Sequence, residues 1–417
     1  MNIWLIYPYG SMPGEGLQPD RASMIASALD KAGHNVIWWG SNIEHRSKTI
    51  RTSNWKEIEI TPGFHIRVVP SIKYSKNISL RRILYEIKFG KQVYLRSKEC
   101  APPDVIIMGE PSFFFYKPIL KIINEFNVKL ILDRLDLWPE LFHMTLPKSI
   151  NRFGKYIFAP LYKRRRFLLN QADGIMAVSN TYLELALSEL YSSPMENTAT
   201  VYFGIDVSAQ RNSKDASIEL PLTLTNIKKK TGEIWAIYAS TLGHNYDLST
   251  LLKTAELLQQ KDINIKILIA GTGPLTQYMI SYIESKNLKN VLYVGNPNSE
   301  IMAKVLSFCD IGLSMYRKDS TVTMPIKVFH YFAAGLLIIN SLKGDIAEIL
   351  TSNNAGVNFA PEDSENLFSI LQMISLNPEK ISVMKNNSYN LASLYDINIQ
   401  YAKVVKLVNE LMNSKKQ

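Results

Sequence analysis

The strongest constraint on the fold is a rhythm of short apolar runs and longer amphipathic stretches, which occurs twice along the 417 residues. In the first half the apolar runs include NIWLIYP, NVIWW, HIRVVP, DVIIMGE, KLILDRL and GIMAVS. Each run has about the length of a strand and is apolar on both faces, which is typical of strands buried in a parallel sheet. Helical periodicity follows in stretches such as 19–32 and 115–125. The sequence therefore predicts a doubly wound α/β sheet.

The rhythm breaks at 207–232, a polar and weakly periodic stretch, and then begins again with IWAIYAS, NIKILIAG, NVLYVG, DIGLSMY and LLIINS. Because the chain is too long for a single core, two domains are expected. We predict an N-terminal α/β domain at 1–207, a C-terminal one at 233–390, and a helical segment at 391–417 that packs back on the first. Open α/β sheets bind ligands at the carboxyl ends of their strands. We therefore expect the site in a cleft between the two domains.

Charge and cysteine content narrow the class of partner. The formal net charge is +10, which favours nucleic acid, an anionic membrane surface or phosphorylated substrates. Two cysteines, Cys100 and Cys309, indicate neither a disulfide framework nor a zinc site. The opening MNIWLIYPYG is typical of a first strand rather than a signal peptide, and no apolar run is long enough to span a membrane.

The loop YPYGSMPGEGLQPDR follows the first expected strand and leads into a helix near Pro19. Gly14 and Gly16 permit close backbone approach, and the helix N-terminus offers N–H groups to an anion. Arg21 lies at the start of the same helix. The spacing of the glycines is not the dinucleotide-binding pattern, so a plain strand-to-helix turn is the alternative.

Two further loops follow strands of the second half. In IAGTGPL, Gly271 and Gly273 form a tight turn before a helix, and this turn needs no ligand to explain it. In YASTLGHNYD, Gly243 allows close approach of a ligand. His244 in that loop is more typical of an exposed histidine than of a catalytic one.

The segment TMPIKVFHYFAAG carries the strongest local signal for a binding site. Thr323 and Pro325 are suited to start a helix, and Gly335 is suited to end it. Lys327 then falls in the first turn, where a cation is unfavourable unless an anion compensates it. His330 follows three residues later on about the same face. A diphosphate at this helix start would satisfy the charge; a surface lysine and a packed histidine are the alternative.

Carboxylates could orient hydroxyl groups near these loops. The strand in LILDRLDLWPELF delivers Asp133 and Asp136 to its carboxyl end, and Asp133 is also a candidate for a structural role. Asp319 precedes the Lys327 helix. We take Asp136 as the first catalytic candidate and Asp319 as the second.

Basic residues are concentrated in two segments of the first half, 73–98 and 152–167, where they alternate with aromatic and aliphatic residues. This composition suits an anionic membrane surface. The membrane or acceptor candidates in the second segment are Arg152, Lys155, Lys163, Arg164, Arg165 and Arg166. A solvated basic face is the alternative, and no recognisable nucleic-acid-binding module accompanies the charge.

Taken in order, these motifs resemble a family-4 retaining glycosyltransferase of GT-B architecture, in which two Rossmann-like domains face each other across a cleft. The resemblance is to the branch found in bacterial O-antigen, capsule and exopolysaccharide clusters. It is carried by RLDLWPE, ADGIMAVS, VYFGID, IAGTGPL, FCDIGL, MPIKVFHYFAAG and GDIAEIL, and it covers nearly the whole chain.

The resemblance implies a donor site made by Gly14, Gly16, Arg21, Gly243, Gly271, Gly273, Thr323, Lys327 and His330. Several positions depart from the family pattern. Val322 and His330 stand where many members have a pair of glutamates, and Thr241 and Tyr246 stand where an arginine and a lysine are usual. Because a neutral imidazole accepts one hydroxyl proton where a carboxylate accepts two, we expect a different ribose contact, such as that of a deoxyribose donor.

The implied function is transfer of a sugar, with retention, from a nucleotide-diphosphate sugar to a lipid-linked or soluble glycan acceptor in surface polysaccharide assembly. No metal or other cofactor is expected, and the expected location is cytoplasmic, at the inner face of the cell membrane. The alternatives are a nucleotide-sugar 2-epimerase or another GT-B enzyme, or a non-catalytic protein that binds nucleotide or glycan.

Overall fold

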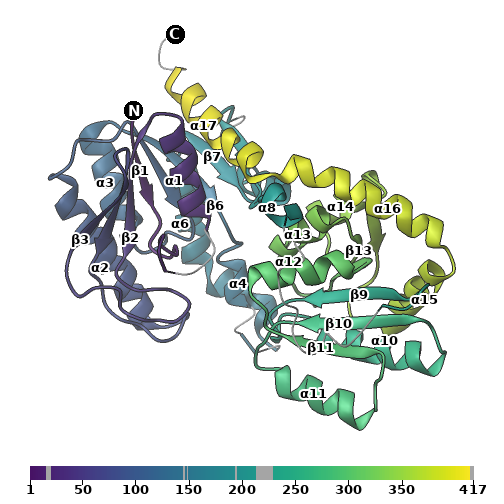
Figure 1. Ribbon diagram of the computed structural model, residues 1–417. Helices are drawn as coiled ribbons and strands as arrows, with labels where there is room; N and C mark the ends of the chain where they lie inside the picture. Colours follow the sequence, from purple (N-terminus) through teal and green to yellow (C-terminus); the bar gives the residue numbers. More distant parts are fainter. Residues whose placement is uncertain (16–19, 144–145, 148, 193–194, 213–228, 414–417) are drawn as a thin grey trace. The chain divides into compact units, whose positions relative to one another are not determined.

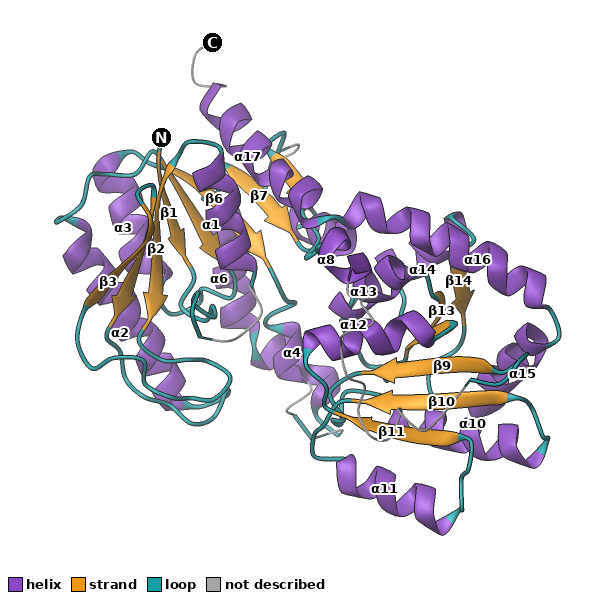
Figure 2. Cartoon of the chain, viewed as in Figure 1, coloured by secondary structure: helices purple, strands orange, loops and turns teal. Residues whose placement is uncertain are grey.

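The computed structural model describes residues 1–15, 20–143, 146–147, 149–192, 195–212 and 229–413 (Figure 1). The chain divides into two compact units, Met1–Tyr202 with Asn398–Gln417, and Phe203–Ile397. Each unit is built on its own mainly parallel sheet with helices around it (Figure 2). The predicted α/β class with two such domains is confirmed. Most of the expected connection at 207–232 lies outside the described residues.

The sheet of the first unit contains eight described strands in the order β3-β4-β2-β1-β5-β6-β7-β8. All neighbouring pairs are parallel except β3 and β4. The strands are β1 (Asn2–Ile6), β2 (Asn35–Ser41), β3 (Lys56–Thr61), β4 (Phe64–Val69), β5 (Val105–Gly109), β6 (Lys129–Arg134), β7 (Gly174–Ala177) and β8 (Thr198–Thr200). The sequence rhythm did not predict β3, because this edge strand is mostly exposed and alternates charged with apolar residues.

The helices of the first unit cover this sheet and close its core. They are α1 (Arg21–Lys31), α2 (Leu80–Ser97), α3 (Tyr116–Phe126), α4 (Glu140–His143), α5 (Gly154–Ile157), α6 (Ala159–Leu169), α7 (Asn180–Leu187) and α17 (Ile397–Asn413). The core joins Trp4 and Trp39 from the sheet to Phe89 and Phe115 from the α2–α3 layer. α17 is attached where Gln400 accepts a hydrogen bond from the Tyr202 amide, at 3.1 Å.

The sheet of the second unit contains six described strands, all parallel, in the order β11-β10-β9-β12-β13-β14. The strands are β9 (Ile234–Ala239), β10 (Ile265–Ala270), β11 (Val291–Gly295), β12 (Ile311–Ser314), β13 (Leu337–Asn340) and β14 (Gly356–Asn358). The chain reverses direction across the sheet between β9 and β12. Such a switch point is where doubly wound sheets bind ligands.

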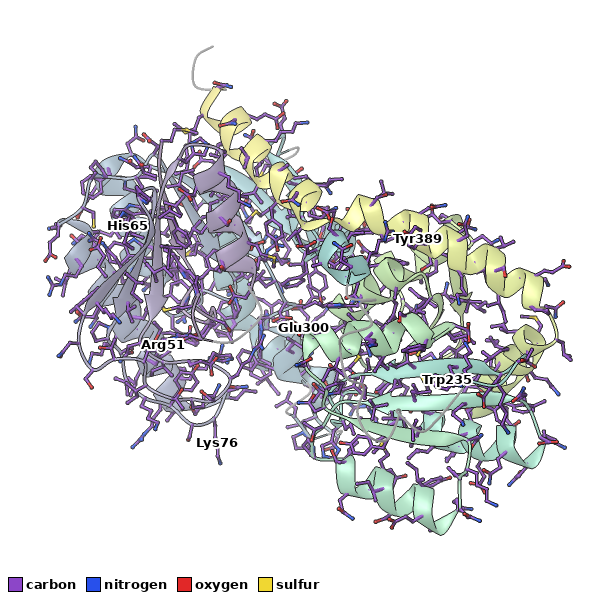
Figure 3. The ribbon with its side chains drawn as sticks, viewed as in Figure 1. Arg51, His65, Lys76, Trp235, Glu300 and Tyr389 are labelled. Atoms are coloured by element: carbon purple, nitrogen blue, oxygen red, sulfur yellow. The ribbon has the colours of Figure 1, made fainter. Side chains whose placement is uncertain are left out.

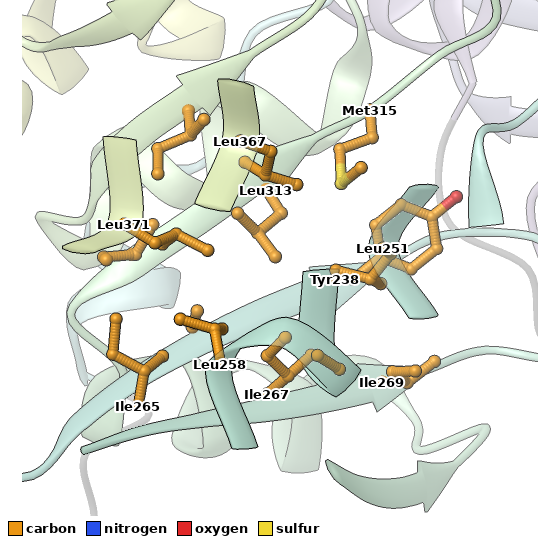
Figure 4. Packing of buried hydrophobic residues seen from close by; sticks show 14 of the residues in the cluster. Tyr238, Leu251, Leu258, Ile265, Ile267, Ile269, Leu313, Met315, Leu367 and Leu371 are labelled. Atoms are coloured by element: carbon orange, nitrogen blue, oxygen red, sulfur yellow. The ribbon is translucent and has the colours of Figure 1, made fainter. Parts of the chain in front are cut away.

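The helices of the second unit are α8 (Val207–Asn212), α10 (Leu248–Gln260), α11 (Thr276–Ser285), α12 (Ser299–Phe308), α13 (Ile326–Ala334), α14 (Asp345–Ser352), α15 (Ser364–Ser375) and α16 (Pro378–Leu391). Side chains of β9, β10 and β12 meet those of α10 and α15 in one buried cluster (Figure 4). Tyr238 lies at the carboxyl end of β9, where the cluster reaches the loops.

Candidate functional site

The N-terminus of α13 lacks a side-chain cap. Pro325 occupies the N-cap position and makes no side-chain hydrogen bond there. By contrast, Asp247, Asn298 and Asp363 accept hydrogen bonds from the first turns of α10, α12 and α15. The Val328 N–H donates to the Pro325 carbonyl at 3.1 Å, so the N–H groups of Ile326 and Lys327 are the ones that face the helix start without a side-chain cap. Helix N-termini of this kind bind anions. Thr323, which is predicted to help start the helix, lies just before it. Its carbonyl oxygen accepts a hydrogen bond from the Ile346 N–H at 3.0 Å.

Lys327 lies in the first turn of α13, and its ammonium is surrounded by aromatic rings. Its Nζ lies 5.0 Å from the ring centre of Tyr238, 5.1 Å from that of Tyr246 and 4.6 Å from that of Tyr316. It also donates a hydrogen bond to Ser240 Oγ at 3.2 Å. We call Tyr238, Tyr246 and Tyr316 the tyrosine cage. Its ring faces hold the ammonium by cation–π attraction at the carboxyl ends of β9 and β12.

No carboxylate of the described residues compensates the charge of Lys327. Among the described residues, none forms an ion pair with its Nζ. Burial lowers the pKa of Lys327 to about 7, because desolvation disfavours the charged form. A buried cation without a counter-ion, next to uncapped helix amides, is suited to bind an anion such as a phosphate.

Tyr246 belongs to the cage through a specific local geometry. Its backbone forms an antiparallel bridge with that of Tyr316, and the two ring centres are 5.0 Å apart. Tyr246 is the position where the resemblance leads one to expect a lysine. The departure at Tyr246 is visible in the sequence, but the roles of Tyr238 and Tyr316 are not, because their proximity depends on strands β9 and β12 being neighbours.

The glycines after β9 and β10 have different roles. A Cβ on Gly271, whose φ is +122°, would lie 1.9 Å from the Ser240 carbonyl oxygen, and one on Gly273 would lie 2.4 Å from that of Leu242. These two glycines let the loops after β9 and β10 pack together. This agrees with the alternative that they form a tight turn for structural reasons and need no ligand. A Cβ on Gly243 would meet just one atom within 4 Å, at 3.8 Å. Gly243 therefore leaves room for close approach of a ligand.

His330 lies on α13 one turn after Lys327, and its Nδ1 is 3.1 Å from Gln210 Oε1. Burial lowers the pKa of His330 to about 4, so the ring is neutral at pH 7. With the amide oxygen as acceptor, Nδ1 carries the proton and Nε2 is an acceptor. The ring can therefore accept one hydrogen bond from a ligand hydroxyl, as predicted from its type.

His244 and Asp319, the two other residues of the second unit considered for a catalytic role, make none of the cage contacts. His244 is exposed on its loop, as expected. Asp319 has a side chain that is 55% exposed, and its carboxylate lies 3.5 Å from Arg317 in a surface ion pair. This solvated setting gives no support to a catalytic role for Asp319.

In the first unit, Arg21 is a core residue rather than a free cation. Its guanidinium makes a bidentate ion pair with Asp133, at 2.6 and 2.7 Å, and donates to the Val201 carbonyl at 2.6 Å. The Tyr7 hydroxyl donates to the same carboxylate at 2.6 Å. The Arg21 side chain is 3% exposed. These contacts correct the expectation that Arg21 binds the donor, because its charge is already neutralised, and they agree with the structural role considered for Asp133.

The glycine loop before α1 is described as far as Glu15; Gly16 lies outside the described residues. Gly14 has a φ of +87°, and a Cβ there would meet nothing within 4 Å. Glu15 forms an ion pair with Arg51, which also donates to the Gly10 carbonyl at 2.9 Å (Arg51 is labelled in Figure 3). Arg51 thus holds the loop at Gly10 and Glu15, and the space beside Gly14 is open.

Asp136 follows β6 and keeps more than a third of its surface exposed. The protein atoms around its carboxyl nevertheless raise its pKa to about 6, chiefly by desolvation. A carboxyl with a pKa near neutrality can both accept and donate a proton. Asp136 remains the first candidate for a catalytic carboxylate.

The basic segment 152–167 divides into exposed and buried charges. Arg152, Lys155, Lys163 and Arg166 are exposed, whereas Arg164 is partly buried, with its guanidinium 5.4 Å from the Phe114 ring centre. Arg165 is buried and ion-paired with Glu140 and Glu189. Arg165 therefore holds α6 to its neighbours, and its assignment to a membrane or acceptor surface is corrected.

In the part of the chain that the structure describes, no group of three or more His, Cys, Asp and Glu side chains is placed to hold a metal ion. Within the same residues, no helix combines the length and apolar character needed to cross a membrane.

Comparison with known proteins places this geometry in a class. Residues 224–391, which contain α13 and the whole cage, match the family described as "Glycosyl transferases group 1". The second unit thus carries a glycosyltransferase domain, and the prediction of such a domain is confirmed.

Curated relatives and solved structures extend the comparison. The chitobiosyldiphosphodolichol beta-mannosyltransferase of Dictyostelium discoideum is 28% identical over 124 residues, 30% of this chain and 25% of that protein. Its counterpart in Kluyveromyces lactis is 19% identical over 384 residues, 86% and 83% of the two chains. The chain spans only about a quarter to two fifths of the first curated relatives it matches. The sucrose-phosphate synthase of Thermosynechococcus elongatus superposes with a TM-score of 0.75 at 15% identity over 99% of both chains, which establishes the GT-B fold.

Proposed function

We propose that the protein transfers a sugar from a nucleotide-diphosphate sugar to a lipid-linked glycan acceptor in the assembly of a bacterial surface polysaccharide. In this reaction the bond between the sugar C1 and the diphosphate oxygen breaks, a bond from C1 to an acceptor hydroxyl oxygen forms, and the nucleoside diphosphate leaves with the electron pair. The hydroxyl proton must pass to a base, for which Asp136 and the leaving diphosphate are the candidates.

The observation that carries the proposal is the uncompensated Lys327 ammonium at the uncapped start of α13. Negative charge grows on the diphosphate as it leaves, and preorganised N–H groups with a cation stabilise that charge. The tyrosine cage positions the Lys327 amine without a carboxylate partner. Because its pKa is lowered to about 7, binding of an anionic diphosphate favours the charged form of the amine. The proposed reaction therefore needs no metal ion, because Lys327 and backbone amides supply the positive charge.

The lipid-linked acceptor is supported by two observations. The name of the curated relatives joins mannosyl transfer to a sugar on a diphosphodolichol. In this chain, exposed basic residues of 152–167 lie beside exposed Phe153, Tyr156 and Ile157. Such a surface suits a peripheral position on an anionic bilayer, at the inner face of the cell membrane.

The sequence resemblance and the name of the curated relatives point to different stereochemistry at the sugar C1. The resemblance implies retention, whereas the relatives' name specifies a β-mannoside, which inversion would give from an α-linked donor. We retain retention as the proposal, and the anomeric configuration of the product decides it.

The experiment is a panel of UDP-, GDP- and dTDP-sugars incubated with the purified protein, membrane lipid extract and EDTA. Release of nucleoside diphosphate together with a glycosylated lipid supports the proposal, and NMR of the product gives its anomeric configuration. Conversion of a nucleotide sugar to its epimer without acceptor would instead identify an epimerase. Binding of nucleotide with no turnover of any donor would contradict an enzymatic role, and activity abolished by EDTA would contradict metal independence.

A further inference from the structure

The first unit contains an apolar pocket that has no signal in the sequence, because its walls come from segments far apart in the chain. It has a volume of about 320 Å³ and is walled by Phe113, Phe114, Trp138, Phe142, Phe158 and Leu161. These residues come from the loop after β5, the loop after β6, α4 and the start of α6. The volume and the apolar walls are in the range of ligand sites, which run from ~300 to 1,000 Å³.

The rim of the pocket carries exposed apolar side chains. Ile78 and Leu80, at the start of α2, line it and are 47% and 79% exposed. On the α6 side, Phe158 and Leu161 line it, and Tyr156 and Ile157 directly before them are 81% and 47% exposed. Two segments far apart in sequence thus supply apolar side chains to one pocket, and each carries exposed apolar residues in or directly beside its lining residues. Contiguous exposed apolar surface of this kind marks contact with an apolar partner.

Positive charge accompanies the apolar rim. Lys76 and Arg81 are exposed and directly adjoin pocket-lining residues in sequence, and Lys73 is exposed a few residues earlier. Lys76 is seen projecting from its loop in Figure 3. Lys155 is exposed next to Tyr156. The stretch 73–98 contains a single acidic residue, Glu86, and that residue is buried. The rim is therefore suited to a molecule that is apolar along its length and anionic at one end.

The inner polar groups of the pocket are already satisfied. Glu86 accepts a hydrogen bond from the Tyr9 hydroxyl at 2.5 Å, and Arg82 lies 3.4 Å from Glu86 and donates to the Asn77 carbonyl at 2.7 Å. Burial raises the pKa of Glu86 to about 7. The pocket thus presents few unsatisfied polar groups to a sugar, whose hydroxyls each need a partner.

We propose that this pocket receives the proximal alkyl or isoprenyl segment of a lipid phosphate, with the phosphate held at the basic rim. The inference rests on the proposed function, because this lipid would be the carrier of the glycan acceptor. It adds a specific binding site for the alkyl or isoprenyl segment of the lipid, which is distinct from general attraction of the protein to a bilayer.

The test uses dodecyl phosphate below its micelle concentration as the probe, with inorganic phosphate and dodecyl maltoside as comparators, and measures binding by calorimetry. Leu161→Trp fills the pocket, and Leu185→Trp, at an exposed position of α7, is the matched control. We expect dodecyl phosphate to bind the wild type and Leu185→Trp equally and Leu161→Trp at least tenfold more weakly. Inorganic phosphate should give the same titration with the wild type and with Leu161→Trp, because it lacks the alkyl chain that would occupy the pocket.

A second variant covers the case in which Leu161→Trp does not fold. Lys76→Glu with Arg81→Glu reverses two exposed charges and should weaken binding of dodecyl phosphate several-fold while leaving that of dodecyl maltoside unchanged. Equal binding of dodecyl phosphate to wild type and to whichever of these variants folds would overturn the proposal, as would no binding to the wild type. Preference for dodecyl maltoside over the phosphate would overturn it too.

These measurements distinguish failure of the lipid-pocket proposal from failure of the proposed glycosyl transfer. If nucleotide binding depends on Lys327 but dodecyl phosphate does not bind, the donor site stands and the lipid pocket is wrong. If dodecyl phosphate binds in the pocket but no nucleotide sugar binds, the proposed transfer is wrong while the lipid site stands.

Discussion

The ammonium of Lys327 lies 5.1 Å from the ring centre of Tyr246, the residue that stands where the sequence resemblance predicts a lysine. An aromatic ring cannot bind a phosphate as a lysine would. The Tyr246 ring instead helps to position the ammonium of Lys327. With fewer side-chain cations, the amides of α13 and Lys327 must carry more of the interaction with a diphosphate.

Replacing Lys327 with alanine should weaken nucleotide-sugar binding on the order of 10- to 100-fold, because a charge-assisted contact to phosphate is lost. Calorimetric titration with the preferred donor measures the effect. Lys261→Ala, an exposed lysine after α10, is the control and should leave affinity unchanged. Equal losses in the two variants would count against the site.

Binding should also depend on pH through Lys327, whose pKa is lowered to about 7 in the free protein. Diphosphate binding favours the protonated amine, so affinity should fall as pH rises from 7 to 9. In the same range the unfolded chain, with a lysine pKa near 10.5, binds more protons than the folded one. The free energy of unfolding of the unliganded protein should therefore rise with pH from 7 towards 10. Both trends should be reduced in Lys327→Met, and unchanged trends in that variant would exclude Lys327 as their source.

Asp133→Asn should destabilise the first unit by about 3–5 kcal/mol, because it leaves the buried Arg21 without its charge partner. Denaturant unfolding measures this. Glu125→Gln breaks the exposed pair with Lys121 and should cost less than about 1 kcal/mol. A stable Asp133→Asn variant that has selectively lost donor affinity would instead support a donor role for Arg21.

His330→Glu should shift nucleotide preference towards ribose over deoxyribose, because a carboxylate accepts two hydroxyl protons where the neutral ring accepts one. Competition among UDP, GDP and dTDP gives the preference of each form. A wild type that already prefers UDP clearly would end the idea of a deoxyribose donor.

Charge reversal of Arg152 and Lys155 should weaken binding to vesicles rich in anionic lipid, by about 1 kcal/mol per residue at low salt. Sedimentation with vesicles measures the bound fraction, and Lys289→Glu, in the second unit, is the control. Binding that is insensitive to both the reversal and added salt would contradict an electrostatic membrane surface.

Some features of this protein follow from the sequence alone because they depend on residues close together in the chain. Alternating apolar runs indicated both parallel sheets, since a strand buried on two faces must be apolar on two faces. The Pro325–Lys327 segment indicated an anion site at a helix start, since capping and helix dipole are local properties.

Other features were decided only by the tertiary structure. Arg21 and Asp133 are 112 residues apart, and their pairing decides that Arg21 is buried rather than free. Arg165 looks like its basic neighbours in sequence, but Glu140 and Glu189 neutralise it. The tyrosine cage joins β9 to the loop after β12, and the apolar pocket joins α2 to α6. Strand order and chain packing bring these side chains together, and the electrostatic character of a charged group is set by its neighbours in space rather than in sequence.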